Sequence, residues 1–222
     1  MTYPFIDSAY VSTSIERPDA ERVRAARAFP AATLLEANGK RGALPSQIKP
    51  VNPKFRVCGP AVTVHSPPGD NLWLHRALVL AQPGDVLVVY TSDFHEAGYW
   101  GEVMSTAARR RNIAGLVIDG CVRDADLLTE IGFPVFARGL CIRGTSKDFA
   151  ARGWINHPLR IGEVPVRPGD LVVGDADGVV VVAQEALGAT LDAAREREAQ
   201  EANIIERISN GEATLDIYGW NR

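Results

Sequence analysis

The sequence lacks a long apolar run, a cysteine framework and an excess of basic residues. No uninterrupted apolar stretch approaches the roughly 20 residues that a membrane-spanning helix needs. The three cysteines, Cys58, Cys121 and Cys141, show no CxxC spacing, which argues against disulfides or a zinc knuckle and indicates reduced thiols. A formal net charge of −3 offers no basic field for nucleic acid or an anionic membrane. With no signal-peptide pattern at its N-terminus, we expect the protein to be cytoplasmic.

Several catalytic and cofactor motifs are also missing. No GxGxxG follows a strand and no GxxxxGK[ST] occurs, so dinucleotide or nucleoside-triphosphate binding has no motif. No lysine stands in an apolar context, so a Schiff-base mechanism lacks a desolvated amine. The histidines share no HxH or HExxH spacing; His75 is typical of a packed helix position, whereas His95 lies in a loop that could line a ligand crevice. These absences favour metal-assisted chemistry.

The central third of the chain predicts parallel strands covered by helices. Apolar, non-alternating strands are expected at 83–91, 115–119 and 133–139, and helices at 102–112 and 124–131. Short links between them are typical of a β-α-β-α-β unit, whose strands are buried on both faces. The chain is therefore predicted to have an α/β fold.

The flanking regions extend this unit without a linker-like division. Residues 19–29 predict a helix, residues 56–65 a strand in which Pro60 indicates an edge or a bulge, and residues 168–182 a strand hairpin. We expect one domain over 1–183. The Glu- and Arg-rich helical arm over 184–222 has a sparse apolar face, which suggests packing against a neighbouring subunit.

Two segments follow adjacent predicted strands and are candidates for a ligand site. Ligands of open parallel sheets bind beyond the carboxyl ends of the strands. After the first strand, the free N–H groups of residues 101–104 at a helix start would form an anion cradle, and Gly101 would permit close approach. After the second come Arg123 and Asp124. The structural alternatives are a helix start without a ligand, a solvated Arg123, and an Asp124 that caps the following helix.

Taken together, these groups suit an α-keto acid. Backbone amides and a guanidinium can hold its oxygens, and a carboxylate can hold Mg²⁺ or Mn²⁺ while the ion keeps most of its waters. Such a cation would neutralise charge on an enolate.

The stretch "GYWGEVMSTAARRRNIAGLVIDGCVRDADLL" resembles the central signature of the 4-hydroxy-4-methyl-2-oxoglutarate / 4-carboxy-4-hydroxy-2-oxoadipate aldolases. These belong to a superfamily that includes the regulator of ribonuclease E activity A. Four further stretches are similar to that family: "ATLLEANGKRGAL", "GPAVTV", "GTSKDF" and "VRPGDLVVGDADGVVVV". The resemblance covers most of the chain, although the region around "TSDFHEAGYW" does not match closely.

The resemblance implies a class II pyruvate aldolase with a layered β/β/α fold, assembled as trimers or hexamers with sites between subunits. The cofactor would be a divalent metal, Mg²⁺ in the first place, with Mn²⁺ or Co²⁺ as alternatives. Asp124 would be the direct protein ligand of the metal, and Arg123 would bind the pyruvate moiety and stabilise its enolate. The backbone amides of Gly101, Glu102, Val103 and Met104 would hold the carboxylate; Val103-Met104 replaces the commoner leucine pair.

Further acidic residues are implied around the waters of the metal. They match Glu102 and Glu36, the latter from an adjacent subunit, and a glutamate of the arm, for which Glu198 and Glu201 fit equally. The general base, a metal-bound water poised by Glu36 or Glu102, stays open. The expected reaction is retro-aldol cleavage to pyruvate, as in aromatic compound catabolism, with oxaloacetate decarboxylation as a side activity. The alternatives are a non-catalytic ribonuclease regulator and a decarboxylase or hydrolase on the same scaffold.

Overall fold

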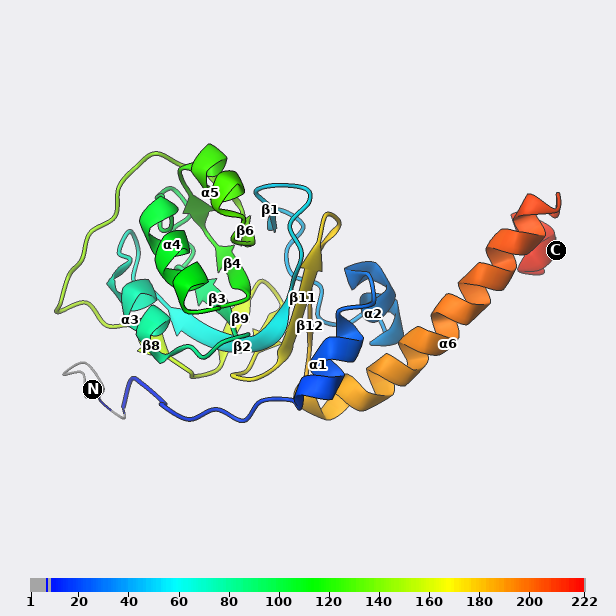
Figure 1. Cartoon of the computed structure of the whole chain (residues 1–222), viewed down its shortest axis with the longest axis horizontal. Coiled ribbons are helices and arrows are strands. Elements are labelled where there is room, and N and C mark those ends of the chain that lie inside the picture. Colours follow the sequence, from blue (N-terminus) through cyan, green and yellow to red (C-terminus); the bar gives the residue numbers. More distant parts are fainter. Residues whose placement is uncertain (1–6, 8, 222) are drawn as a thin grey trace.

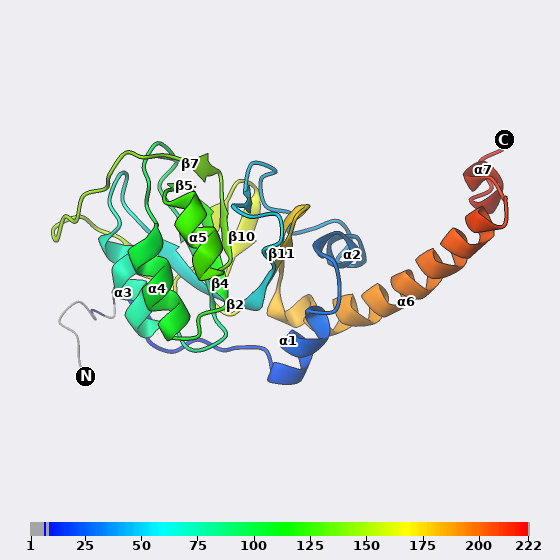
Figure 2. The ribbon, with the colours of Figure 1, turned by 45° about the horizontal axis from the view of Figure 1, so that its top comes forward.

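The computed structural model describes residue 7 and residues 9–221. A mixed α/β body contains the sheets and most of the helices, and a long helix, α6 (Gln184–Ser209), runs away from it (Figure 1). A short helix, α7 (Thr214–Ile217), folds back at the far end of this arm (Figure 2). The α/β class and the C-terminal helix are as expected from the sequence.

Four parallel strands form the centre of the body. They lie side by side in the order β6 (Val135–Ala137), β4 (Gly115–Asp119), β3 (Val86–Tyr90) and β2 (Val57–His65). The connecting helices α3 (Leu72–Leu80), α4 (Glu102–Arg110) and α5 (Ala125–Ile131) cover one face of these strands. Because Tyr90 pairs with Asp119, the carboxyl ends of β3 and β4 are neighbours. The predicted β-α-β-α-β core is confirmed.

The strands are apolar throughout because both of their faces are covered. In β3, Leu87 and Val89 pack with the helices, whereas Val86 and Val88 pack into a second apolar layer on the other side. All four are fully buried. This is the burial that a continuous apolar strand predicts.

The second layer is made by antiparallel strands that continue the sheet. β11 (Leu171–Asp175) pairs with β2, and β12 (Gly178–Val182) pairs with β11. At the opposite edge, β1 (Lys49–Pro50) pairs with β6, and the residues before β1 return to β12 through a bridge between Ala43 and Val180. The sheet is therefore nearly closed around its second apolar layer.

Three short strand pairs complete the body. The hairpin of β9 (Leu159–Ile161) and β10 (Val164–Val166) packs into the second apolar layer, and β8 (Trp154–Ile155) pairs with the end of β2. β5 (Cys121–Val122) runs parallel to β7 (Gly139–Leu140) just beyond the end of β4.

The expectation that Pro60 marks an edge was wrong. β2 is an interior strand with β11 and β3 on its two sides. Proline is tolerated there because the register with β3 begins only at Ala61, so the missing N–H falls at the start of that ladder. On the other side, the N–H of Ala61 donates to the carbonyl of Asp170.

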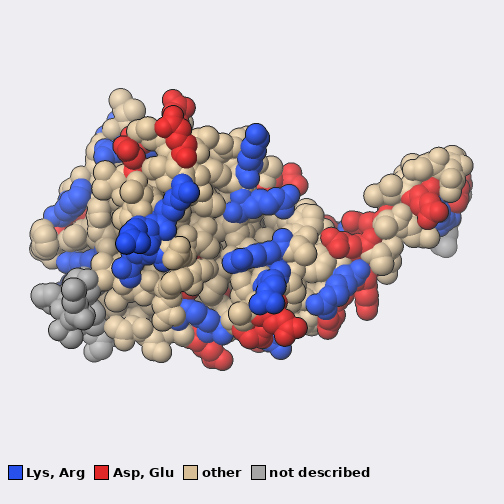
Figure 3. Space-filling view, viewed as in Figure 1, with Lys and Arg blue, Asp and Glu red and all other residues tan. Residues whose placement is uncertain are grey.

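The arm is anchored at its first turns. Leu187, Leu191 and Ala194 are buried against α1 (Ala20–Ala26), α2 (Ala31–Ala37) and the β11–β12 pair. Asp19 caps α1 as predicted, since its side chain accepts a hydrogen bond from the N–H of Arg22. Beyond Ala194 the helix still contacts α2 through Arg197 and Glu36 before it runs away from the body, and it carries both acidic and basic side chains (Figure 3).

Within residue 7 and residues 9–221, no helix is long and apolar enough to cross a membrane.

Candidate functional site

Backbone hydrogen bonds between three extended segments hold the loop after β3 beside the loop after β4. The N–H of Tyr99 donates to the carbonyl of Cys121, and the N–H of Arg123 donates to the carbonyl of Trp100. On the far side, the N–H of Cys141 donates to the carbonyl of Val122. These bonds fix the start of α4 beside the start of α5.

A pocket of about 270 Å³ opens where the two helices begin. It is lined by residues from four segments: Asn71 and His75 from the α3 region; Gly98 to Met104; Arg123 and Asp124; and Gly144, Thr145 and Lys147. The structure therefore brings together the predicted residues Gly101, Glu102, Val103, Met104, Arg123 and Asp124 in one cavity.

Asp124 does not cap its own helix through its side chain. It occupies the N-cap position of α5 in a left-handed conformation (φ 62°), and its carboxylate makes no bond to the first turn of that helix. Instead, Oδ2 accepts a hydrogen bond from the backbone N–H of Glu102 at 3.0 Å, at the start of α4. The carboxylate of Asp124 thus faces the positive end of α4, where a negative group is favourable, and no hydrogen bond occupies its Oδ1 within the described residues.

Gly101 is required by this arrangement. A Cβ atom at this position would lie 2.2 Å from Asp124 Oδ2 and 3.2 Å from Arg123 Cγ. Beside the engaged N–H of Glu102, the backbone N–H groups of Gly101, Val103 and Met104 donate to no acceptor in the described part of the chain. Free donors at a helix start form a site for an anion.

The Arg123 side chain lines the same pocket beside Asp124. Its Nε lies 3.7 Å from Asp124 Oδ2, and its side chain is 49% exposed. A guanidinium in this position neutralises part of the charge of Asp124 and keeps donors free for a ligand.

Asn71, His75 and Lys147 are among the pocket residues that were not selected from the sequence. Asn71 donates from Nδ2 to the carbonyl of Tyr99 and so supports the loop. His75 lines the pocket and is half-buried rather than packed; burial and the nearby Lys147 lower its pKa, against the influence of Asp70. Lys147 is exposed at the rim. These three residues share a pocket only because the α3 region lies beside the 144–147 loop, and no local spacing in the sequence indicates this contact.

Glu36 and the arm glutamates lie elsewhere in the chain. Glu36 belongs to α2, and its Oε2 lies 3.8 Å from both Lys40 Nζ and Arg197 Nη1. Glu201 pairs with the same Arg197 at 2.8 Å, and Glu198 is exposed. None of these three lines the pocket of Arg123 and Asp124 within one chain.

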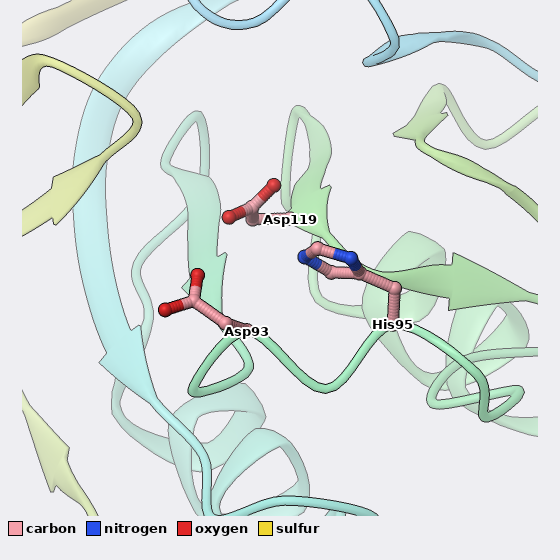
Figure 4. Close-up of side chains that lie close together, drawn as sticks. All are labelled: Asp93, His95 and Asp119. Carbon is pink, nitrogen blue, oxygen red and sulfur yellow. The ribbon is translucent and has the colours of Figure 1, made fainter.

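A separate group of metal-ligating side chains lies at the carboxyl ends of β3 and β4. Asp93, His95 and Asp119 place one ligand atom each within 4.8 Å of the others, so a set of residues that could hold a metal ion is present (Figure 4). Asp119 is buried at the end of β4, whereas Asp93 and His95 come from the loop after β3. Sequence reasoning noted His95 alone, because the three positions show no ligand spacing.

Comparison with protein families identifies the class. The family model described as RraA-like, Aldolase/RraA, matches residues 20–181. The chain therefore belongs to the RraA-like family. A protein of Halalkalibacterium halodurans named "Putative 4-hydroxy-4-methyl-2-oxoglutarate aldolase" is 36% identical over 192 residues, which are 86% of this chain and 90% of that protein.

Solved structures share the fold. An uncharacterized protein of Pseudomonas syringae is 30% identical with a TM-score of 0.76, covering 90% of this chain and 97% of that one. Streptomyces coelicolor RraAS2, described as an unusual member of the RNase ES inhibitor RraA family, is 32% identical with a TM-score of 0.75 and covers 90% of this chain and all of that one. Relatives thus carry both an aldolase name and an inhibitor name.

Proposed function

We propose that the protein is a divalent-metal-dependent aldolase that cleaves a 4-hydroxy-2-oxo acid to pyruvate and a second oxo compound. The observation that carries the proposal is the junction of the α4 and α5 starts, where a carboxylate, a guanidinium and free amides line one pocket. The relative with an aldolase name supports the same activity.

The residues present fit a hard divalent cation. Asp124 Oδ1 is free within the described residues, and the glycine at 101 leaves room beside the carboxylate that a side chain would fill. Mg²⁺ commonly binds through one or two carboxylates while it keeps several waters. Bound at Asp124, the cation would act as a Lewis acid toward the keto oxygen of the substrate. Mn²⁺ and Co²⁺ are alternative ions.

The protein groups around it have distinct roles in this proposal. The free N–H groups at the start of α4 hold the substrate carboxylate, since they point at the pocket and carry the positive end of the helix dipole. Arg123 donates to the oxygen on which enolate charge develops as the C3–C4 bond breaks. Glu102, exposed at the pocket wall, and Glu36 from a second copy of the chain are the candidates that poise a water for removal of the C4 hydroxyl proton.

Shared use of Glu36 requires an oligomer, which we propose to be a trimer or hexamer in which the arm packs on a neighbouring subunit. Oxaloacetate decarboxylation passes through the same enolate and is proposed as a side activity. The distal half of the substrate, which none of these groups holds, would lie toward His75 and Lys147. The neutral imidazole of His75 and the ammonium of Lys147 face the pocket there.

A substrate panel tests the proposal. Purified protein would be assayed for pyruvate release from 4-hydroxy-4-methyl-2-oxoglutarate, 4-carboxy-4-hydroxy-2-oxoadipate and oxaloacetate, with Mg²⁺ and then with EDTA. We expect metal-dependent release from at least one hydroxy-oxo acid. Release from oxaloacetate alone would identify a decarboxylase, and no release from any of them would favour the ribonuclease-inhibitor role named for RraA relatives.

A further inference from the structure

We propose that Asp93, His95 and Asp119 bind a transition-metal ion of the zinc class at a second site, distinct from the Mg²⁺ site proposed at Asp124. The two sites lie on opposite faces of the sheet. Val117, two residues before Asp119, packs into the layer inside the nearly closed sheet, whereas the α4 pocket lies on the helix-covered face. The second site therefore does not depend on the proposed aldolase function.

The three side chains converge without touching one another. Figure 4 shows the imidazole of His95 directed toward the space between the two carboxylates. In tetrahedral coordination, bonds of about 2.0–2.2 Å to one zinc ion hold its ligand atoms roughly 3.3–3.6 Å apart. The ligand atoms here lie within 4.8 Å of one another, so side-chain shifts of up to about 1 Å bring them into range.

Each carboxylate accepts a hydrogen bond at one oxygen, and no residue that the structure describes donates to the other. The Tyr90 hydroxyl donates to Asp93 Oδ2 at 2.9 Å, and Arg138 Nε donates to Asp119 Oδ1 at 2.5 Å. Outer partners that fix metal-binding carboxylates in this way are the usual support of a metal site.

His95 Nε2 is the observation that points to a ligand. The atom is buried and has no hydrogen-bond partner in the described part of the structure, although two carboxylates lie nearby. A buried imidazole nitrogen without a partner costs free energy. A cation held between the three ligand atoms would give this nitrogen a partner.

The donor set selects the kind of ion. The imidazole nitrogen and the two carboxylate oxygens are all ligand types that Zn²⁺ accepts, and a fourth position is left for water. Mg²⁺ prefers oxygen ligands alone. Arg138 neutralises part of the charge of Asp119, so the electrostatic attraction between Asp119 and a bound cation is weaker. The bond to the imidazole nitrogen therefore contributes more to the choice of ion.

Binding here would fix the segment that leads into the α4 pocket. The carbonyl of His95 accepts from the N–H of Cys121, and the Tyr99 hydroxyl donates to the carbonyl of Phe94. The same stretch continues to Gly101. An ion at Asp93, His95 and Asp119 would therefore tie the loop after β3 to the end of β4.

Titration of the chelator-treated full chain tests the proposal. Zn²⁺ binding would be measured by calorimetry, and Co²⁺ by its visible absorption, in the presence of excess Mg²⁺. We expect one Zn²⁺ that Mg²⁺ does not displace, and a Co²⁺ spectrum with nitrogen and oxygen ligands. His95→Ala should weaken Zn²⁺ binding by at least ~100-fold, and Tyr90→Phe by ~10–100-fold as an outer partner.

Two further variants separate this site from the proposed catalytic one. Glu96→Ala, an exposed neighbour of His95 outside the cluster, should bind Zn²⁺ as the wild type does. Asp124→Asn should also keep the Zn²⁺ while it loses Mg²⁺-dependent turnover. The proposal is overturned if Asp124→Asn removes the Zn²⁺, if His95→Ala and Tyr90→Phe leave it unchanged, or if Mg²⁺ displaces it. Circular dichroism would confirm that each variant is folded.

Discussion

The α4 pocket and the contact between α2 and α6 place their acidic groups in opposite surroundings. Asp124 faces backbone N–H groups at the positive end of a helix, with one oxygen free of hydrogen bonds within the described residues. Glu36 lies between two cationic side chains, Lys40 and Arg197. The first carboxylate is positioned but available to a ligand, whereas the second is already paired within its own chain.

This difference shows how a site can be divided between copies of one chain. A single chain assembles the pocket of Arg123 and Asp124, but Glu36 and the arm glutamates belong to another region of it. If Glu36 takes part in the proposed reaction, it does so in the pocket of a neighbouring copy.

The largest effect is expected from Arg123→Ala. Loss of the guanidinium should lower kcat for pyruvate release by about 10²–10³-fold, the usual effect of removing a group that stabilises an oxyanion. Steady-state kinetics with Mg²⁺ would measure it, with Arg110→Ala, an exposed residue at the last position of α4 that does not line the pocket, as control. Near-normal turnover of Arg123→Ala would show that Arg123 takes no part in the reaction.

The next effect concerns the space beside Asp124. In Gly101→Ala, the new Cβ would lie 2.2 Å from Asp124 Oδ2 and displace the carboxylate, so we expect a loss of activity of roughly 10²-fold. Gly144→Ala is a matched control, since it lines the same pocket and its Cβ would meet nothing within 4 Å. Equal activities of the two variants would mean that the Gly101–Asp124 contact is unimportant.

Mixing two inactive variants tests whether the site is shared. Arg123→Ala and Glu36→Gln would be unfolded together and refolded at equal amounts. If a pocket takes Arg123 from one copy and Glu36 from another, about a quarter of the pockets should regain both residues. Activity of the mixture that only averages the two parents would show that no pocket combines Arg123 of one copy with Glu36 of another.

A smaller effect is expected at the rim of the pocket. Lys147→Ala should raise KM for 4-hydroxy-4-methyl-2-oxoglutarate by up to about 5-fold, the equivalent of one exposed ion pair. KM for 4-hydroxy-2-oxopentanoate, which lacks the distal carboxylate, should not change. Equal shifts for both substrates would show that Lys147 does not bind that group.

The smallest effect concerns the acid stability of the body. Burial lowers the pKa of His65 from 6.5 to about 4, and its ring stacks on Trp154 at 3.6 Å. The folded state therefore binds fewer protons than the unfolded state between these values, so stability should fall as pH drops from about 6.5 toward 4. Urea unfolding at pH 7.5 and 5.0 should show a smaller loss for His65→Phe than for the wild type. Identical losses would assign the effect to other groups.

Much of the body could be predicted from the sequence, because local pattern and burial agree there. The apolar runs at 83–91 and 115–119 are strands with helices between them, and this alone puts Gly101 next to Asp124. The role of Asp124 could not be resolved in this way. Its position predicts a cap for α5, but its left-handed backbone turns the carboxylate to α4.

Groups that depend on distant contacts were not predictable. His75 joins Lys147 only because α3 packs beside the 144–147 loop, and Asp93, His95 and Asp119 meet only because β3 and β4 are neighbours. Pro60 was misread because its tolerance depends on where the ladder with β3 begins. In each case the deciding factor is tertiary register, which no local spacing encodes.

The proposed reaction depends most on a cation at Asp124 that binds the same three-carbon ligand as Arg123. Oxalate has the two adjacent oxygens of a pyruvate enolate, so its binding, measured by calorimetry with and without Mg²⁺, tests this claim directly. We expect oxalate to bind only with Mg²⁺, and not to bind Asp124→Asn under either condition. Equal binding with and without Mg²⁺, or undiminished binding to Asp124→Asn, would contradict it.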